Sequence, residues 1–130
     1  MASLAELLAE SGGAGHASEL SVERALLVEE WIEAHLHEPI TLGRLCEVAG
    51  VGDRCLQKTF LARRGSTPTQ YVINRRLEAV HTQLLGAVGA AEVTPIAMAC
   101  GFTHMGRFST MYRQRFGESP SRTLRRRAGS

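Results

Sequence analysis

TLGRLCEVAGVGDRCLQKTFLARRGSTP, at residues 41–68, is the stretch that decides the fold, because residues 92–120 repeat its pattern as EVTPIAMACGFTHMGRFSTMYRQRFGESP. Matching positions are 51 residues apart up to the turn glycine and 52 residues apart beyond that turn. The matched pairs are Leu42 and Val93, Leu45 and Ile96, Ala49 and Cys100, Gly50 and Gly101, Leu56 and Phe108, Phe60 and Tyr112, Gly65 and Gly117, and Pro68 and Pro120. A helix, a glycine turn and a second helix that recur in this way predict two helix-turn-helix units.

Helix start and stop signals extend this pattern along the chain. Thr67 and Gln70 form a capping box with proline at the first helical position, which predicts a long helix from about residue 68 to about residue 85. Ser21 is placed to start an earlier helix that Pro39 stops, and Asp53 is placed as the N-cap of the helix that ends at Gly65. Because no alternation typical of strands occurs, only helices are expected.

The chain divides into a short lead and one domain. Residues 1–20 end in SGGAGHAS, a glycine- and serine-rich segment that predicts a flexible lead. We expect the domain to span residues 21–127, with helix-turn-helix units at about 41–64 and 93–116, the linker helix at about 68–85 and a C-terminal helix at about 120–127.

The charges are segregated along the chain, although the net charge is only +2. Residues 1–50 hold nine acids and two bases, a net charge of −7, whereas residues 51–130 hold four acids and thirteen bases, a net charge of +9. A basic half of this kind indicates a polyanionic partner. Fourteen of the fifteen bases are arginine, whose planar fork suits phosphates and guanine edges.

Other classes of function find little support in the sequence. No stretch approaches the roughly 18 consecutive apolar residues of a membrane span. Cys46, Cys55 and Cys100 form no CxxC pair, which predicts a reduced, cytoplasmic protein without disulfides or a thiolate metal site. His35 and His37 lie on different helix faces, and no acid or histidine is arranged to activate Cys55, although its helix-start position is expected to lower its pKa. We therefore expect no enzyme, no cofactor and no metal.

Two sets of residues together form a specific signature. They are Ile40-Thr41-Leu42, Leu45, Gly50, Leu56-Gln57, Phe60, Gly65-Ser66-Thr67-Pro68 and Tyr71, and then Ile96-Ala97, Gly101-Phe102, Phe108-Ser109, Arg113, Arg115-Phe116-Gly117 and Ser119-Pro120. With them, residues 40–127 resemble the DNA-binding domain of the AraC/XylS family of bacterial transcription regulators. The resemblance implies an all-α fold of seven helices, in which a long central helix joins two helix-turn-helix subdomains. It also implies activation or repression near promoters, with double-stranded DNA and RNA polymerase as partners in the bacterial nucleoid.

The length of the linker helix agrees with this resemblance. About 18 helical residues span roughly 27 Å, which is near the ~34 Å between successive major-groove faces of B-DNA. One chain is therefore expected to read two adjacent grooves.

The residues expected to contact bases lie on the second helix of each unit. Burial of the apolar pair in the first unit leaves Arg54, Gln57 and Lys58 outward, where the family reads bases; arginine and lysine suit guanine, and glutamine suits adenine. In the second unit, burial of Phe108 and Tyr112 is expected to leave Gly106, Arg107 and Thr110 exposed where the family reads bases. Gly106 has no side chain, and Thr110 stands where a long basic residue is common in the family. The second unit is therefore expected to be the weaker specificity element.

Phosphate contacts are expected from a helix start and from scattered arginines. They are assigned to Thr41, Arg75, Arg76, Arg113, Arg115 and Arg122. For each arginine, simple surface charge is an equally good interpretation. Arg63 and Arg64, at the far end of their helix, are expected to complement its dipole.

Two other functions stay open at this point. One is an α-helical protein-interaction module that has only non-specific DNA affinity and uses its acidic first helices. The other is the DNA-targeting part of a repair enzyme that accepts methyl groups on a cysteine. Whether a separate sensing domain accompanies this chain is also open, and we expect no small-molecule pocket within it.

Overall fold

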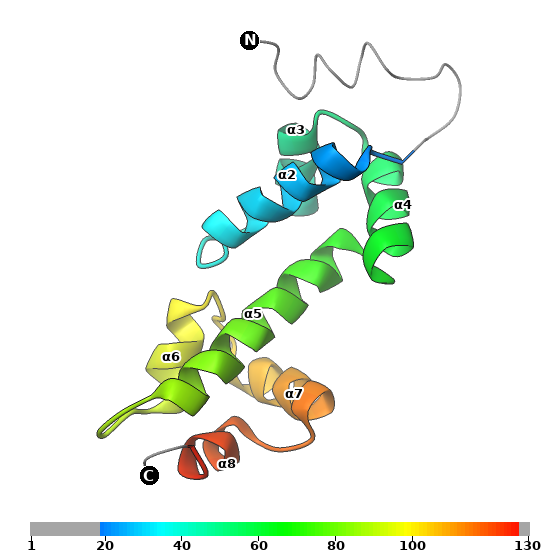
Figure 1. Cartoon of the computed structure of the whole chain (residues 1–130). Coiled ribbons are helices and arrows are strands. Elements are labelled where there is room, and N and C mark those ends of the chain that lie inside the picture. The colour runs from blue at the N-terminus through cyan, green and yellow to red at the C-terminus, as the bar shows by residue number, and fades with distance from the viewer. Residues whose placement is uncertain (1–18, 128–130) are drawn as a thin grey trace. The chain divides into compact units, whose positions relative to one another are not determined.

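The computed structural model describes residues 19–127, and these form seven helices without a strand (Figure 1). The helices are α2 (Val22–Ala34), α3 (Leu42–Ala49), α4 (Asp53–Arg64), α5 (Pro68–Gly86), α6 (Val93–Ala99), α7 (Met105–Phe116) and α8 (Pro120–Arg125). The expected all-α fold with a long central helix is confirmed.

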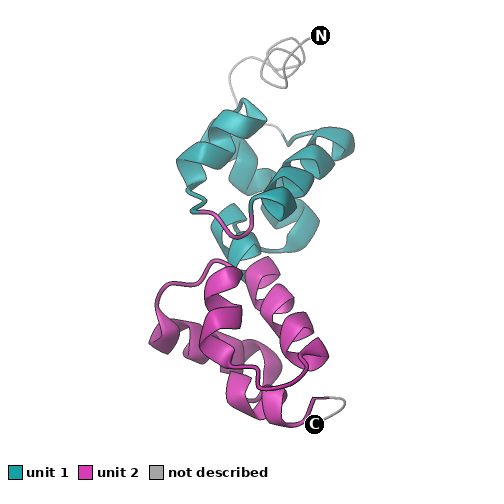
Figure 2. Ribbon diagram, turned by 90° about the vertical axis from the view of Figure 1, so that its left-hand side faces the viewer, with its two compact units in different colours: residues 1–35, 39–73 teal, residues 36–38, 74–130 magenta. Residues whose placement is uncertain are grey.

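Two compact units make up this part of the chain (Figure 2). Unit 1 comprises residues 19–35 and 39–73, and unit 2 comprises residues 36–38 and 74–127. Helix α5 belongs to both units, because its residues up to Ile73 are in unit 1 and those from Asn74 onward are in unit 2. Each unit therefore contains one of the two repeated helix-turn-helix stretches.

The core of unit 1 is formed by the apolar faces of α2, α3 and α4. Its fully buried side chains include Val28 and Ile32 of α2, Leu45 of α3, and Leu56 and Phe60 of α4. Burying each such side chain contributes about 1.5 to 3 kcal/mol. The turn between α3 and α4 begins at a left-handed glycine, as the repeat predicts.

Leu20, counted in the flexible lead by the sequence, is part of this core. Its side chain is buried, and its N–H donates to Thr59 Oγ1 at 2.8 Å. Residues 1–18 of the predicted lead lie outside the described residues.

The core of unit 2 combines aliphatic residues of α5 with an aromatic cluster. Phe108 and Tyr112 of α7 are fully buried, and Tyr112 lies 4.6 Å from Phe116 between ring centroids. The Tyr112 hydroxyl donates to Thr123 Oγ1 at 2.9 Å and is hydrogen-bonded to His81 Nδ1 at 2.8 Å. These bonds satisfy the buried polar groups that join α5, α7 and α8.

A second polar contact inside unit 2 fixes residues 36–38 against α5. The Arg76 guanidinium donates to the Leu36 carbonyl oxygen at 2.8 Å and to the Glu38 carbonyl oxygen at 2.6 Å. Gly101 packs directly against this contact at a φ of +104°, and a Cβ there would lie 2.7 Å from both the Leu36 oxygen and Arg76 Nε. Only glycine fits this position of the repeat.

Three helix ends differ from the sequence prediction. Helix α2 ends at Ala34, before Pro39, because the backbone of its C-cap His35 departs from helical geometry at a φ of −119°; the His35 ring stacks on Trp31 at 4.0 Å and bonds to its carbonyl oxygen. Gly52, and not Asp53, is the N-cap of α4; the Asp53 carboxylate lies in the first turn, where it suits the helix dipole. Helix α8 ends at Arg125, two residues before the predicted end, because Arg126 is its C-cap and donates its backbone N–H to the carbonyl oxygen of Arg122.

Across residues 19–127, no helix is long and apolar enough to cross a membrane.

Candidate nucleic-acid interface

Helix α4 presents a polar face opposite its buried residues. Leu56 and Phe60 are fully buried, whereas Arg54 and Lys58 are exposed and Gln57 is half-buried. Arg54, Gln57 and Lys58 follow the helical spacings of three and four residues, so they share one face. The structure therefore brings together the three side chains that the sequence assigned to base contacts in the first unit.

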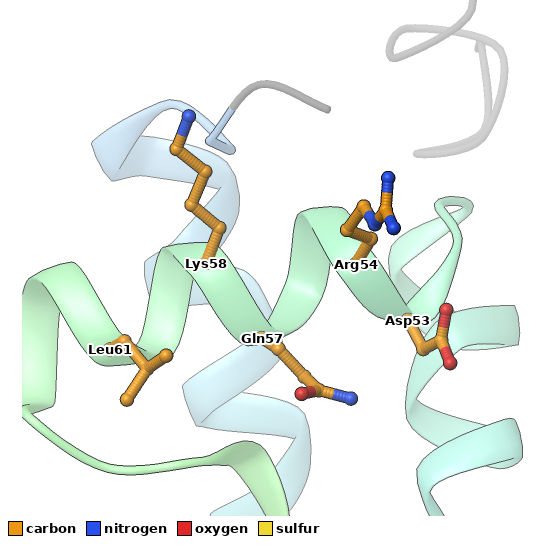
Figure 3. A pocket seen from close by; sticks show the side chains of 5 residues that line it. All are labelled: Asp53, Arg54, Gln57, Lys58 and Leu61. Carbon is orange, nitrogen blue, oxygen red and sulfur yellow. The ribbon is translucent and has the colours of Figure 1, made fainter. Parts of the chain in front are cut away.

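A shallow hollow follows this face of α4 (Figure 3). It is lined by Asp53, Arg54, Gln57, Lys58 and Leu61, and we call it the α4 hollow. In Figure 3, Arg54 and Lys58 extend along one edge of the helix, and Gln57 and Leu61 extend along the other. Four of its five residues carry a polar or charged group, so the hollow is suited to hydrogen bonding with base edges.

Helix α7 offers fewer reading groups than α4. Gly106, Arg107 and Thr110 are all exposed. The Thr110 hydroxyl donates back to the Gly106 carbonyl oxygen at 3.2 Å, and a Cβ at Gly106 would meet nothing within 4 Å. Arg107 is thus the one long polar side chain among these three.

Two of the arginines assigned to phosphate contact share one carboxylate. Glu78 of α5 accepts hydrogen bonds from Arg75 on the same helix and from Arg115 on α7. The three side chains are each about a third exposed, at 34%, 38% and 35% for Arg75, Glu78 and Arg115. A DNA phosphate would therefore compete with Glu78 for both arginines.

The remaining phosphate candidates differ in their surroundings. Arg76 is committed to the carbonyl oxygens of Leu36 and Glu38, so its guanidinium holds unit 2 together, which argues against phosphate contact. Thr41 caps α3, and its hydroxyl accepts from the Arg44 N–H at 3.1 Å. Arg113 and Arg122 are exposed on α7 and α8.

Arg63 and Arg64 have a role that the sequence did not suggest. Both donate to Glu29 of α2, whose side chain is buried. Burial alone would raise the pKa of Glu29, but the hydrogen bonds and positive charges of the two arginines lower it below 4.5. They stabilise a buried carboxylate, in addition to suiting the C-terminal end of the α4 dipole.

Sequence reasoning missed two residues, Leu61 in unit 1 and Glu78 in unit 2. Leu61 follows Gln57 by four residues, so helical spacing alone would have placed it on the reading face. Glu78 follows Arg75 by three residues, which predicts their contact, but its contact with Arg115 requires the packing of α5 against α7.

The metal and cysteine chemistry that the sequence raised can be compared with the described residues. No group of three His, Cys, Asp or Glu side chains within residues 19–127 is arranged to hold a metal ion. Burial raises the pKa of the Cys55 thiol despite its place near the start of α4, so the expected lowering is wrong.

Known proteins resemble this chain in sequence and in fold. Residues 45–126 match a family described as a helix-turn-helix domain. The chain is 43% identical over 101 residues to the XylDLEGF operon transcriptional activator 3 of Pseudomonas putida, a match that covers 77% of this chain and 30% of that relative. This chain thus corresponds to less than a third of the length of that relative.

Solved structures agree with this match. The crystal structure of a probable AraC family transcriptional regulator from Rhodopseudomonas palustris CGA009 is 38% identical, with a TM-score of 0.72 over 80% of this chain and 96% of that chain. The DNA-binding domain of AdpA, solved in complex with a target DNA, is 25% identical, with a TM-score of 0.71 over 78% of this chain and 90% of that chain. The chain therefore belongs to the AraC/XylS family of transcription regulators and contains the DNA-binding domain of that family.

Proposed function

We propose that this chain is a sequence-specific DNA-binding transcription regulator whose helices α4 and α7 read two successive major grooves near a promoter. The observation that carries the proposal is the α4 face, where Arg54, Gln57 and Lys58 stand outward from a fully buried apolar pair. A helix of this kind fits the major groove and presents hydrogen-bonding groups to base edges.

The two units would contribute differently to recognition. Arg54 and Lys58 suit the O6 and N7 acceptors of guanine, and Gln57 suits adenine. Unit 2 offers Arg107 as its one obvious reader, so most of its contribution would be phosphate contacts from Arg113, Arg115 and Arg122. Specificity would then reside mainly in the half-site bound by unit 1.

The partners, the location and the sign of regulation of this chain belong to the same proposal. Double-stranded DNA is the partner, and RNA polymerase is the proposed second partner, in the bacterial nucleoid. Activation is the favoured sign of regulation, because the Pseudomonas relative is named as an operon activator. No catalytic step is assigned to this chain.

Selection from random duplexes tests the proposal directly. The 130-residue chain is incubated with random duplexes of about 20 to 25 base pairs, which cover two helical turns, and the bound fraction is amplified and sequenced. The affinity of the winner and of a scrambled control is then measured across a salt series. We expect a motif in two parts, bound at least about a thousandfold more tightly than the scrambled duplex.

A second function is favoured by one observation on α2. Val22, Leu26 and Leu27 are exposed there beside the acids Glu23 and Glu30. An exposed apolar and acidic surface suits a protein-interaction module that has only non-specific DNA affinity. Equal and steeply salt-dependent binding to all duplexes would support this module and contradict the regulator.

A further inference from the structure

Leu61 is an exposed leucine in a setting that differs from other exposed apolar residues of the chain. Its exposed fraction is 53%, and it lines the α4 hollow together with Arg54, Gln57 and Lys58. Leu27 of α2 is exposed to a similar degree, at 52%, but it does not line this hollow. A single exposed leucine needs no explanation by itself, whereas one placed within a polar reading face does.

The position of Leu61 on α4 places it beside a base-reading side chain. It follows Gln57 by one helical turn and lies along the same edge of the helix (Figure 3). Four residues correspond to about 6 Å along the helix axis. This distance equals about two base-pair steps of B-DNA, which rises 3.4 Å per base pair along each strand.

The major groove contains one apolar group that such a side chain can contact. Each thymine presents a C5-methyl group there, next to the O4 acceptor, and apolar side chains distinguish thymine by this methyl. We propose that Leu61 is a specificity-determining residue that contacts a thymine C5-methyl group within about two base pairs of the position read by Gln57. This inference rests on the proposed function.

The repeat indicates that this feature belongs to unit 1 alone. At the offset of 52 residues, the counterpart of Leu61 on α7 is Arg113, which is also exposed. Unit 1 thus has an apolar group where unit 2 has a charge. A methyl contact is therefore expected in one half-site, and a phosphate contact at the matching place in the other.

A deoxyuridine scan of the selected duplex tests this contact. Each thymine is replaced in turn by deoxyuridine, which removes only the methyl group, and affinity is measured for the wild-type chain, Leu61→Ala and the matched control Leu27→Ala. Gln57→Ala identifies the base pair read by Gln57, as the position where discrimination is lost.

We expect one thymine within about two base pairs of that position to be sensitive in the wild type, with affinity falling about fourfold when its methyl is removed. Leu61→Ala should abolish this sensitivity, and Leu27→Ala should keep it. Far-ultraviolet circular dichroism verifies that both variants are folded.

The outcomes separate this inference from the proposed function. If the winner has no thymine in that interval, or if Leu61→Ala keeps the methyl sensitivity, the inference is wrong while the regulator stands. If selection yields no preferred duplex, both the proposed function and the inference fail.

Discussion

At the residue scale, α4 and α7, the two helices proposed to read DNA, carry their outward arginines at positions that do not match in the repeat. By the offset of 52 residues, Arg54 corresponds to Gly106, and Arg107 corresponds to the half-buried Cys55. One residue along a helix turns a side chain by about 100°. Arg107 therefore points away from the direction that Arg54 takes on its own helix, and it is less suited to the same base contact.

Arg54→Ala should relax sequence discrimination more than Arg107→Ala. A bidentate contact to guanine is worth about 1 to 3 kcal/mol of discrimination, whereas loss of a phosphate contact weakens binding to all sequences alike. Binding of each variant to the selected duplex and to single-base changes of it measures the difference. A larger loss of discrimination in Arg107→Ala would contradict the assignment of the weaker role to unit 2.

Gly101→Ala tests a second residue, one that matters for stability. At its positive φ the added Cβ would press on the Leu36 carbonyl oxygen and Arg76, so we expect destabilisation of about 2 to 4 kcal/mol. Gly117→Ala is the matched control in unit 2, because it also has positive φ but open space around it, and it should cost only about 1 to 2 kcal/mol. Urea denaturation compares the two, and equal losses would exclude the close contact as the cause.

At the element scale, buried and surface ion pairs join helices with different consequences. The buried Glu29 carboxylate attaches α2 to the partly exposed arginines at the C-terminal end of α4, whereas Glu78 attaches α5 to α7 at the surface. A buried carboxylate that loses its partners is costly, and a surface pair contributes little to stability. The contacts of Glu29 therefore stabilise the fold, whereas Glu78 partly neutralises the positive charge of Arg75 and Arg115 at the surface.

Glu29→Gln should destabilise unit 1 by about 2 kcal/mol at neutral pH. Because the folded-state pKa of Glu29 lies below 4.5, its stabilising contribution is fully present above that pH and is lost as pH falls through the folded-state value. The difference between wild type and variant should consequently shrink below about pH 4.5. Denaturant titrations at neutral and acidic pH measure it, and a difference independent of pH would refute the ionic role.

Glu78→Gln should raise affinity for DNA, because it releases Arg75 and Arg115 to contact phosphates. The gain should be largest at low salt, and stability should change by less than about 1 kcal/mol. Glu30→Gln on α2 removes the same charge from an exposed site and is the matched control. If both variants gain equally across the salt series, net charge explains the effect and Glu78 does not restrain the arginines.

At the scale of the whole molecule, the segregated charges and the two repeated units both bear on the proposed binding of DNA. The basic residues lie in the part of the chain that contains both recognition helices, and the acidic ones lie mainly in the residues up to α3. A basic surface raises affinity for any DNA, while the repeated units provide separate opportunities to read sequence. We therefore expect affinity and specificity to have different origins in this chain.

Changing the spacing of the half-sites tests whether both units bind at once. Insertion of about five base pairs between the halves of the selected motif turns one half to the opposite side of the duplex. Under the proposed reading of two successive major grooves, we expect the affinity to fall to that of the isolated unit 1 half-site. Gel-shift titrations compare the original and lengthened duplexes. Unchanged affinity would mean that unit 2 does not engage its half-site.

The fold and the reading face of α4 followed from local patterns in the sequence. The spacing of Leu56 and Phe60, the capping box at Thr67 and the repeated glycines each act within one or two helical turns. Such short-range constraints predicted the helices and the outward direction of Arg54, Gln57 and Lys58. The end of α2 did not follow from these patterns, since the helix stops at Ala34 and not at Pro39.

Packing between elements decided which charged residues are available to DNA. Arg76 and Arg113 look alike in sequence, but Arg76 binds the carbonyl oxygens of residues 36–38 whereas Arg113 stands exposed. Arg63 and Arg64 likewise have a buried carboxylate 34 and 35 residues away as their partner. By itself, the sequence determined the helices, the repeat and the α4 face, because these depend on neighbours along the chain. Only the tertiary structure determined which arginines serve the fold, because their partners are distant in sequence and adjacent only after the helices pack.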